Sequence, residues 1–175
     1  MTATSHVVRE LTGYMRLHPA ESSPLIPLYD AIRDHVRRGL CTHPGRCPVI
    51  TAGALVVNEE DCALALWDGE RYVFPEALLE GGDDSLRDTA TRALTLAGVR
   101  ETRAAPELDG PFLIDLSPAA PQDARTRYCF RYLYRAHSDG LLPATLENGK
   151  AAWFPLADIG TPGFVRRFKS HLAAF

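Results

Sequence analysis

The chain has 175 residues, of which 46% are hydrophobic and 23% are charged, and this length and composition suit one compact domain with a short appendage. Its formal net charge is −3, so we expect a small molecule or a protein as its partner and no nucleic acid. No apolar run approaches the roughly 18 residues of a membrane-spanning helix, and the first residues lack the apolar core of a signal peptide. We therefore expect no membrane partner and a cytoplasmic location.

Two short helices are predicted at the start of the chain. Apolar residues recur at helical spacing between Val7 and Gly39, with a break at the segment HPAESSP. With the connector that follows, these helices form a predicted N-terminal helical arm, residues 1–45. The main domain is predicted to occupy residues 46–175.

The connector contains a cluster of metal-binding residue types, Cys41, His43 and Cys47. A structural zinc site needs four ligands, and no second pair of ligands follows in the sequence. We therefore expect a loop with reduced thiols there and no metal.

The main domain is predicted to begin with a β-hairpin. The apolar run from Val49 to Val57 is typical of a buried strand, Asn58 to Asp61 of a turn, and Cys62 to Trp67 of the partner strand. Further strand-like segments are RYVF, PFLIDL, RTRYCFRYLYRA and AAWFPL, and GFVRRFKSHLAAF is predicted to be a last helix. This order of elements predicts a layered α/β or α+β fold.

A central helix is predicted over residues 85–97. Ser85 and Asp88 form an S-x-x-D capping pattern, and the negative charges of Asp83 and Asp84 precede it, where the helix dipole favours them. One face of this helix is apolar and carries Leu86, Ala90, Ala93, Leu94 and Ala97.

The stretch from Phe74 to Val99 resembles the signature of the Nudix hydrolase superfamily. The family's box reads G-x5-E-x7-R-E-U-x-E-E-x-G-U, where U is bulky and apolar, and it commonly lies in a P-G-G-x-U-E-x-G-E/D context. Pro75, Glu80, Gly82 and Asp83 match that context, whereas Glu76 and Ala77 replace two glycines. The span from Ala77 to Val99 equals the 23-residue box. The resemblance implies an α/β/α sandwich with a mixed sheet, of the bacterial subgroup with an N-terminal helical arm.

The residues that carry the family's chemistry are absent. In the resembled enzymes, glutamates on successive turns of the box helix hold Mg²⁺ and position the attacking water. Alignment on Arg92 places Ala93, Leu96 and Ala97 at these positions, and an ungapped alignment places Arg92, Thr95 and Leu96 there. Neither alignment supplies a carboxylate. The resemblance therefore implies a degenerate box, the loss of standard pyrophosphohydrolase activity, and no metal cofactor.

An acidic group remains around the start of the box helix. Asp84 and Asp88 lie one helical turn apart and are the weak candidates for binding a divalent ion, although capping is the ordinary role of such residues and the one we expect. If the protein were instead an altered hydrolase that uses Mg²⁺, the candidate catalytic residues would be Glu80, Asp83, Asp84 and Arg92.

The segment RTRYCFRYLYRA alternates arginines with aromatic residues, so that Arg125, Arg127, Arg131 and Arg135 share one face of the strand. We expect the aromatic face in the core and the arginines on a solvated surface. In a binding role, Arg131 could contact a phosphate or carboxylate and Tyr128 could stack on a flat ring. The candidate ligand-binding residues are Glu76, Arg92, Tyr128 and Arg131, and Arg92 is also expected to form an ion pair that braces the box loop.

These observations leave three hypotheses. The first is a Nudix-fold protein repurposed for small-molecule binding or for a metal-independent biosynthetic step. The second is an altered Nudix hydrolase of a nucleoside-diphosphate-type substrate. The third is a non-enzymatic interaction module in which residues 7–39 pack on a partner or on a second copy of the chain, giving a homodimer.

Lysine occurs only at positions 150 and 169, and this bias towards arginine suggests a bacterial source.

Overall fold

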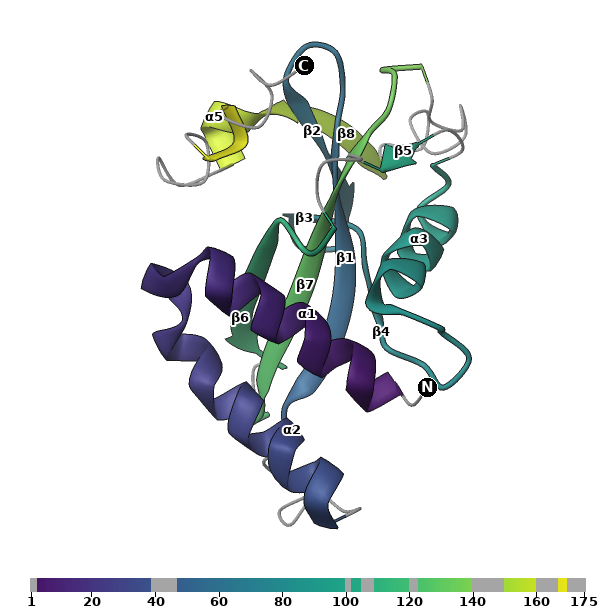
Figure 1. Cartoon of the computed structure of the whole chain (residues 1–175). Helices are drawn as coiled ribbons and strands as arrows, with labels where there is room; N and C mark the ends of the chain where they lie inside the picture. Colours follow the sequence, from purple (N-terminus) through teal and green to yellow (C-terminus); the bar gives the residue numbers. More distant parts are fainter. Residues whose placement is uncertain are drawn as a thin grey trace.

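A computed structural model describes residues 3–38, 47–99, 102–104, 109–119, 123–139, 150–159 and 167–169 (Figure 1). The two N-terminal helices are confirmed as α1 (Ala3–Leu17) and α2 (Ile26–Arg38), with two short 3-10 turns, Pro19–Glu21 and Ser23–Leu25, between them. Both helices and the second 3-10 turn bury side chains in the core that they share with the sheet: Val7, Leu11, Tyr14, Leu25, Leu28 and Ile32. The arm therefore packs on the main domain, and the boundary at residue 45 stays a prediction.

A mixed β-sheet forms the centre of the molecule. Its strands are β1 (Val49–Val57), β2 (Cys62–Trp67), β3 (Tyr72–Val73), β4 (Glu76–Leu78), β5 (Arg103–Ala104), β6 (Leu113–Pro118), β7 (Thr126–Arg135) and β8 (Ala151–Pro155). The strand order is β3-β2-β1-β7-β5, while β4 pairs with β1, β6 with β7, and β8 with β2. β1 and β7 are parallel along their length, and the other described pairs are antiparallel. The predicted α+β class with a mixed sheet is confirmed.

The predicted hairpin of β1 and β2 is confirmed, and one buried side chain organises its turn. The Asn58 carboxamide oxygen accepts hydrogen bonds from the backbone N–H groups of Glu60 and Cys62, and its Nδ2 donates to Ser138. Asp61 adopts a positive φ of 59°, a conformation that Asp tolerates better than most residues. The chain can thus reverse directly after nine strand residues.

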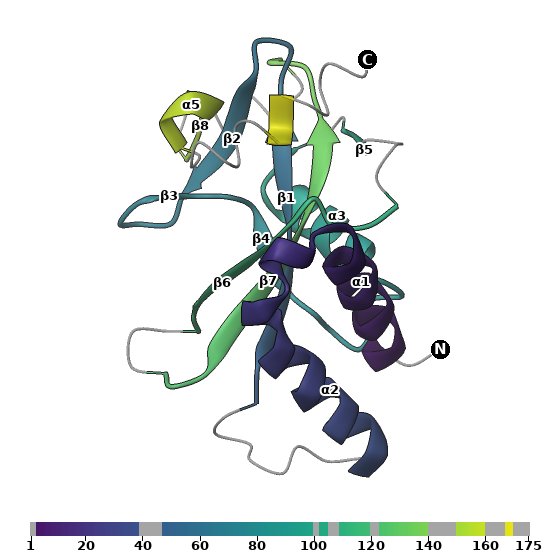
Figure 2. The same ribbon diagram turned by 60° about the vertical axis from the view of Figure 1, so that its left-hand side comes forward.

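Alternate residues of the central strands pack on opposite faces of the sheet. On one face, Ala52, Ala54 and Val56 of β1 and the tyrosines of β7 pack with α1, α2 and the box helix α3 (Leu86–Leu96). On the other face, Leu55, Val57 and Leu133 pack with Phe112, Leu156 and Phe168, next to the short helix α5 (Leu156–Ile159). Figure 2 shows α1 and α3 on one side of the sheet and α5 on the other.

The described cysteines differ in their state. Cys47 is disulfide-bonded, so the expectation of reduced thiols in the connector is wrong for this residue, while Cys62 and Cys129 are free. No helix in the described ranges is long and apolar enough to cross a membrane. Most of the predicted last helix lies outside the described residues, and of it the structure describes 167–169, which are helical.

Candidate functional site

The box helix α3 forms where the sequence predicts it, because its capping and apolar signals are local. The Ser85 hydroxyl oxygen accepts a hydrogen bond from the Asp88 backbone N–H at 3.1 Å and donates to the Asp88 carboxylate at 2.8 Å. Leu86, Ala90 and the other apolar-face residues Ala93 and Leu94 are buried against the sheet. Asp88 therefore serves as part of the helix cap.

The helix offers no carboxylate where the resembled enzymes have glutamates. Ala93 is only 3% exposed, so a carboxylate at this position would be buried against the sheet. Arg92 is partly exposed, and Thr95 and Leu96 are exposed, Leu96 at 74%. The open edge of the helix consequently carries Arg92, Thr95 and Leu96, which are the three residues of the ungapped alignment.

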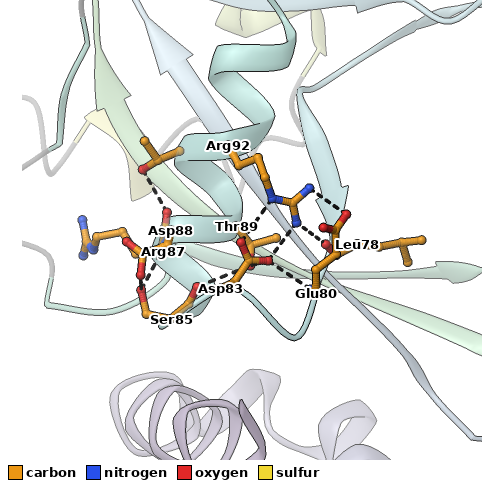
Figure 3. A network of polar contacts seen from close by, with 9 residues as sticks. Leu78, Glu80, Asp83, Ser85, Arg87, Asp88, Thr89 and Arg92 are labelled. Carbon is orange, nitrogen blue, oxygen red and sulfur yellow. Dashed lines mark hydrogen bonds and ion pairs between the residues drawn. The ribbon is translucent and has the colours of Figure 1, made fainter. Parts of the chain in front are cut away.

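The Arg92 guanidinium joins three parts of the box, as Figure 3 shows. Its Nε and Nη2 donate to the two oxygens of Asp83 at 3.1 and 2.8 Å. Nη2 also donates to the Leu78 carbonyl at 2.7 Å, and Nη1 to Glu80 at 3.1 Å. Strand β4, the loop after it and the helix are thereby connected through one cation. The expected bracing role of Arg92 agrees with this geometry.

Asp83 is occupied by neighbouring donors on both of its carboxylate oxygens. Besides Arg92, it accepts hydrogen bonds from the Glu80 backbone N–H at 3.0 Å and from the buried Thr89 hydroxyl at 2.9 Å. The hydrogen bond from Arg92 is the largest cause that lowers the pKa of Asp83 to about 2. A metal ion could therefore bind Asp83 only by displacing these donors.

The other acidic residues of the box loop, Glu80 and Asp84, are exposed to solvent. Glu80 is 65% exposed and bonds Arg92 through its side chain, and Asp84 is exposed before the cap. Within the described ranges, no group of three or more His, Cys, Asp or Glu residues is placed so that it could hold a metal ion.

A second polar group lies on the opposite side of β4 from the box helix, on the sheet face that also carries Leu55 and Leu133. Glu76 accepts hydrogen bonds or ion pairs from Arg127 at 2.9 Å and from Arg131 at 3.1 Å. The Arg131 Nε donates to Asp115. We call these four residues, Glu76, Asp115, Arg127 and Arg131, the sheet-face charge cluster. They come from β4, β6 and β7, so strand pairing alone brings them together.

Gly53 makes this cluster geometrically feasible. It lies on β1 directly between Glu76 of β4 and Arg131 of β7 in the strand register. A Cβ built on Gly53 would lie 2.6 Å from the Pro75 carbonyl oxygen and 2.8 Å from Arg131 Nη1. The arginine side chain can therefore cross β1 only because residue 53 has no side chain.

Arg131 is the most enclosed member of the cluster. Its side chain is 9% exposed, and its guanidinium lies 5.3 Å from the Phe74 ring centre. Nη1 is buried and has no hydrogen-bond partner among the described residues. The expectation of a solvated row of arginines is thus wrong for Arg131. The Glu76 and Asp115 carboxylates balance the positive charge of the buried Arg131 guanidinium.

The predicted ligand-binding residues do not form one group. Glu76 and Arg131 are in contact, and Arg92 reaches β4 two residues further along, at the Leu78 carbonyl. Tyr128 is 3% exposed and packs in the core on the other sheet face, so it does not share a site with Arg131. Sequence reasoning missed Asp115, although the alternation Leu113, Asp115, Ser117 along β6 placed it on one face.

Comparisons with known proteins identify the fold. No protein-family model matches the chain, and no curated protein matches its sequence. A solved UDP-X diphosphatase is 11% identical, with 99% of this chain and 97% of that chain covered and a TM-score of 0.50. A MutT protein of the Nudix hydrolase family from methicillin-resistant Staphylococcus aureus 252 is 12% identical over 74% of this chain and 99% of that one, at a TM-score of 0.48.

A third solved structure, a Nudix hydrolase from Nitrosomonas europaea, is 17% identical, covers 73% of this chain and 90% of that chain, and has a TM-score of 0.45. Identities this low speak for the fold alone. The mixed sheet between helices, together with the likeness to the UDP-X diphosphatase over 99% of this chain, defines an α+β sandwich. This is the α+β sandwich with a mixed sheet that the resemblance to the Nudix superfamily implies.

Replacement of Asp83 by Asn should destabilise the protein in a pH-dependent way. The pKa of Asp83 is lowered from 3.8 to about 2, so its stabilisation is complete above about pH 5 and is lost as the pH falls towards 2. We expect Asp83→Asn to lower the free energy of unfolding by about 1–3 kcal/mol near neutral pH, with the difference vanishing near pH 2. Urea unfolding at a series of pH values measures this. The exposed neighbour provides the control: Asp84→Asn should change stability by less than about 0.5 kcal/mol, and a pH-independent effect of Asp83→Asn would contradict the pairing.

Replacement of Gly53 by Ala should destabilise the protein by about 1–3 kcal/mol, because the new Cβ overlaps a backbone oxygen that cannot move freely. It should also push Arg131 away from Glu76. Thermal and urea unfolding measure the loss. Gly82→Ala is the matched control, since a Cβ there would meet nothing within 4 Å, and equal effects of the two substitutions would show that Gly53 has no special role.

Proposed function

We propose that this protein is a Nudix-fold protein that has lost standard Mg²⁺-dependent hydrolysis and binds a small molecule in place of that chemistry. The observation that carries the proposal is the position of Arg92. In the ungapped alignment it replaces the first metal-binding glutamate, and its guanidinium bonds Leu78, Glu80 and Asp83. A fixed cation therefore neutralises the acidic loop that in the resembled enzymes serves a metal.

The exchange of glutamate for arginine changes the electrostatics of the box. Divalent cations such as Mg²⁺ are bound by several oxygen ligands, usually carboxylates. Here the guanidinium satisfies Asp83 and repels a second cation, and the edge next to it consists of Thr95 and Leu96. Such an edge favours a neutral or anionic molecule over a metal-bridged diphosphate.

The sheet-face charge cluster, on the opposite side of β4 from the box helix, is a separate place at which we propose polar contacts with a small molecule. Arg127 is 29% exposed and Asp115 is 38% exposed, so the cluster offers solvent both a donor and an acceptor. The more buried Glu76 holds Arg127, and the more buried Arg131 holds Asp115. Arg127 can bind a phosphate or carboxylate by paired hydrogen bonds.

An assay with a panel of nucleoside diphosphate compounds and Mg²⁺ tests the loss of hydrolysis. Wild-type protein should show no Mg²⁺-dependent turnover. The triple variant Arg92→Glu, Thr95→Glu and Leu96→Glu restores carboxylates at the open edge and should gain measurable turnover. The double variant Thr95→Glu and Leu96→Glu keeps the Arg92 brace and shows whether the exposed positions tolerate glutamate.

If the wild-type protein hydrolyses these compounds as fast as the triple variant, the proposal is contradicted. If Asp84→Ala then abolishes the wild-type hydrolysis, the altered-hydrolase hypothesis is favoured. Native mass spectrometry of the purified protein addresses binding. A retained small molecule that disappears on Arg127→Ala supports the proposed contacts. A protein that carries no ligand but forms a defined complex or a dimer would favour the interaction module.

A further inference from the structure

A cavity outside the box and outside the sheet-face charge cluster lies between α1 and the segment that leads into β6. Its volume is about 580 Å³, within the range of small-molecule sites in proteins. Its lining includes Arg9, Gly13, Arg16, Asp109, Phe112 and Arg167. Helix α1, whose length is visible in Figure 1, forms one wall.

The inner wall of this cavity is held by a partly buried polar network. The Tyr14 hydroxyl donates to Glu21 and accepts a hydrogen bond from Arg167 Nη1 at 3.1 Å. Arg167 also donates to the Phe112 carbonyl at 3.0 Å and to Glu21, and its guanidinium lies 5.6 Å from the Phe112 ring centre. Because these groups tie the arm, the start of β6 and residue 167 together, the wall is formed before any ligand arrives.

Gly13 leaves the α1 wall open. A Cβ built on this glycine meets nothing within 4 Å, and no described neighbour therefore requires a residue without a side chain there. Glycine inside a helix costs about 1 kcal/mol relative to alanine. We therefore attribute the glycine at position 13 to the space that it leaves in the wall of the cavity.

One arginine of the lining, Arg16, can contact an anion. Arg9, Gly13 and Arg16 lie on one face of α1 because they are four and three residues apart. Arg9 is paired with Glu10, and within the described part of the chain Arg16 has no hydrogen bond or ion pair. Of the three lining arginines, Arg167 is paired with Glu21 and Arg9 with Glu10, so Arg16 is the one that is left to contact an anion, and Asp109 is the further carboxylate of the lining. Guanidinium groups at such sites bind oxyanions in preference to other small groups.

We propose that this cavity binds a small molecule with a compact aromatic or apolar body and one oxyanion group. The oxyanion contacts Arg16 at the outer side of the cavity. The body lies over Gly13 and against the Phe112 side of the cavity. The site does not depend on the proposed function of the box, since no box residue lines it among those described.

Titration of isotope-labelled protein with phenyl phosphate, followed by backbone amide NMR, tests this site. The Gly13 and Gly110 amides should shift in a saturable way, and benzylamine, which has a similar ring but a positive charge, should bind at least about tenfold more weakly. Arg16→Ala should weaken phenyl phosphate binding by about tenfold. Gly13→Leu should abolish it by filling the cavity, without lowering the melting temperature.

Thr12→Leu, on the neighbouring exposed position of α1, is the matched control and should leave the affinity unchanged. The proposal is overturned if phenyl phosphate gives no saturable shift at Gly13 and Gly110, if benzylamine binds equally well, or if folded Gly13→Leu binds like wild type. A Gly13→Leu variant with a lower melting temperature would be replaced by Gly13→Met, which fills the same space with a more flexible side chain. Hydrolysis assays on the box are unaffected by these outcomes, so the two proposals fail separately.

Discussion

The ion pair between Arg92 and Asp83 is the interaction on which the box depends. Arg92, on helix α3, also donates to the Leu78 carbonyl and so connects the helix with β4. The Asp83 carboxylate is fixed by Arg92 and by the Thr89 hydroxyl. The acidic loop is thus kept in place by a residue of the protein itself. Under the proposed function, the box keeps its shape without a metal because Arg92 supplies positive charge next to Asp83 and Glu80.

The two sides of β4 illustrate how a small change in sequence alters the chemistry of a site. Glu76 replaces one of the glycines of the family's loop and reaches Arg127 and Arg131 across β1. Gly53 provides the space for that contact. The backbone approach that glycines allow in the resembled enzymes is therefore replaced here by a charged side chain, and the surface next to the box becomes an ion-pair network.

Much of the fold could be predicted because its signals are local. The unbroken apolar run of β1, the polar turn after it and the S-x-x-D cap of α3 each depend on residues close in sequence. The burial of Arg131 could not be predicted in the same way. Alternation along β7 shows which residues share a face, but Glu76 and Asp115 come from other strands, whose registers depend on long-range pairing. For Tyr128 the alternation was sufficient, because it placed this residue on the aromatic face that we expected in the core, and the structure confirms its burial.

The central claim is that Arg92 occupies the role of the metal. Titration of isotope-labelled wild-type protein with Mn²⁺ tests it most directly, because a bound paramagnetic ion broadens the amide signals around it. The predicted result is no saturable broadening of the amides from Glu80 to Arg92, with a saturable site appearing in the variant that carries glutamate at positions 92, 95 and 96. Saturable broadening centred on Asp83 and Asp84 in the wild-type protein would contradict the claim.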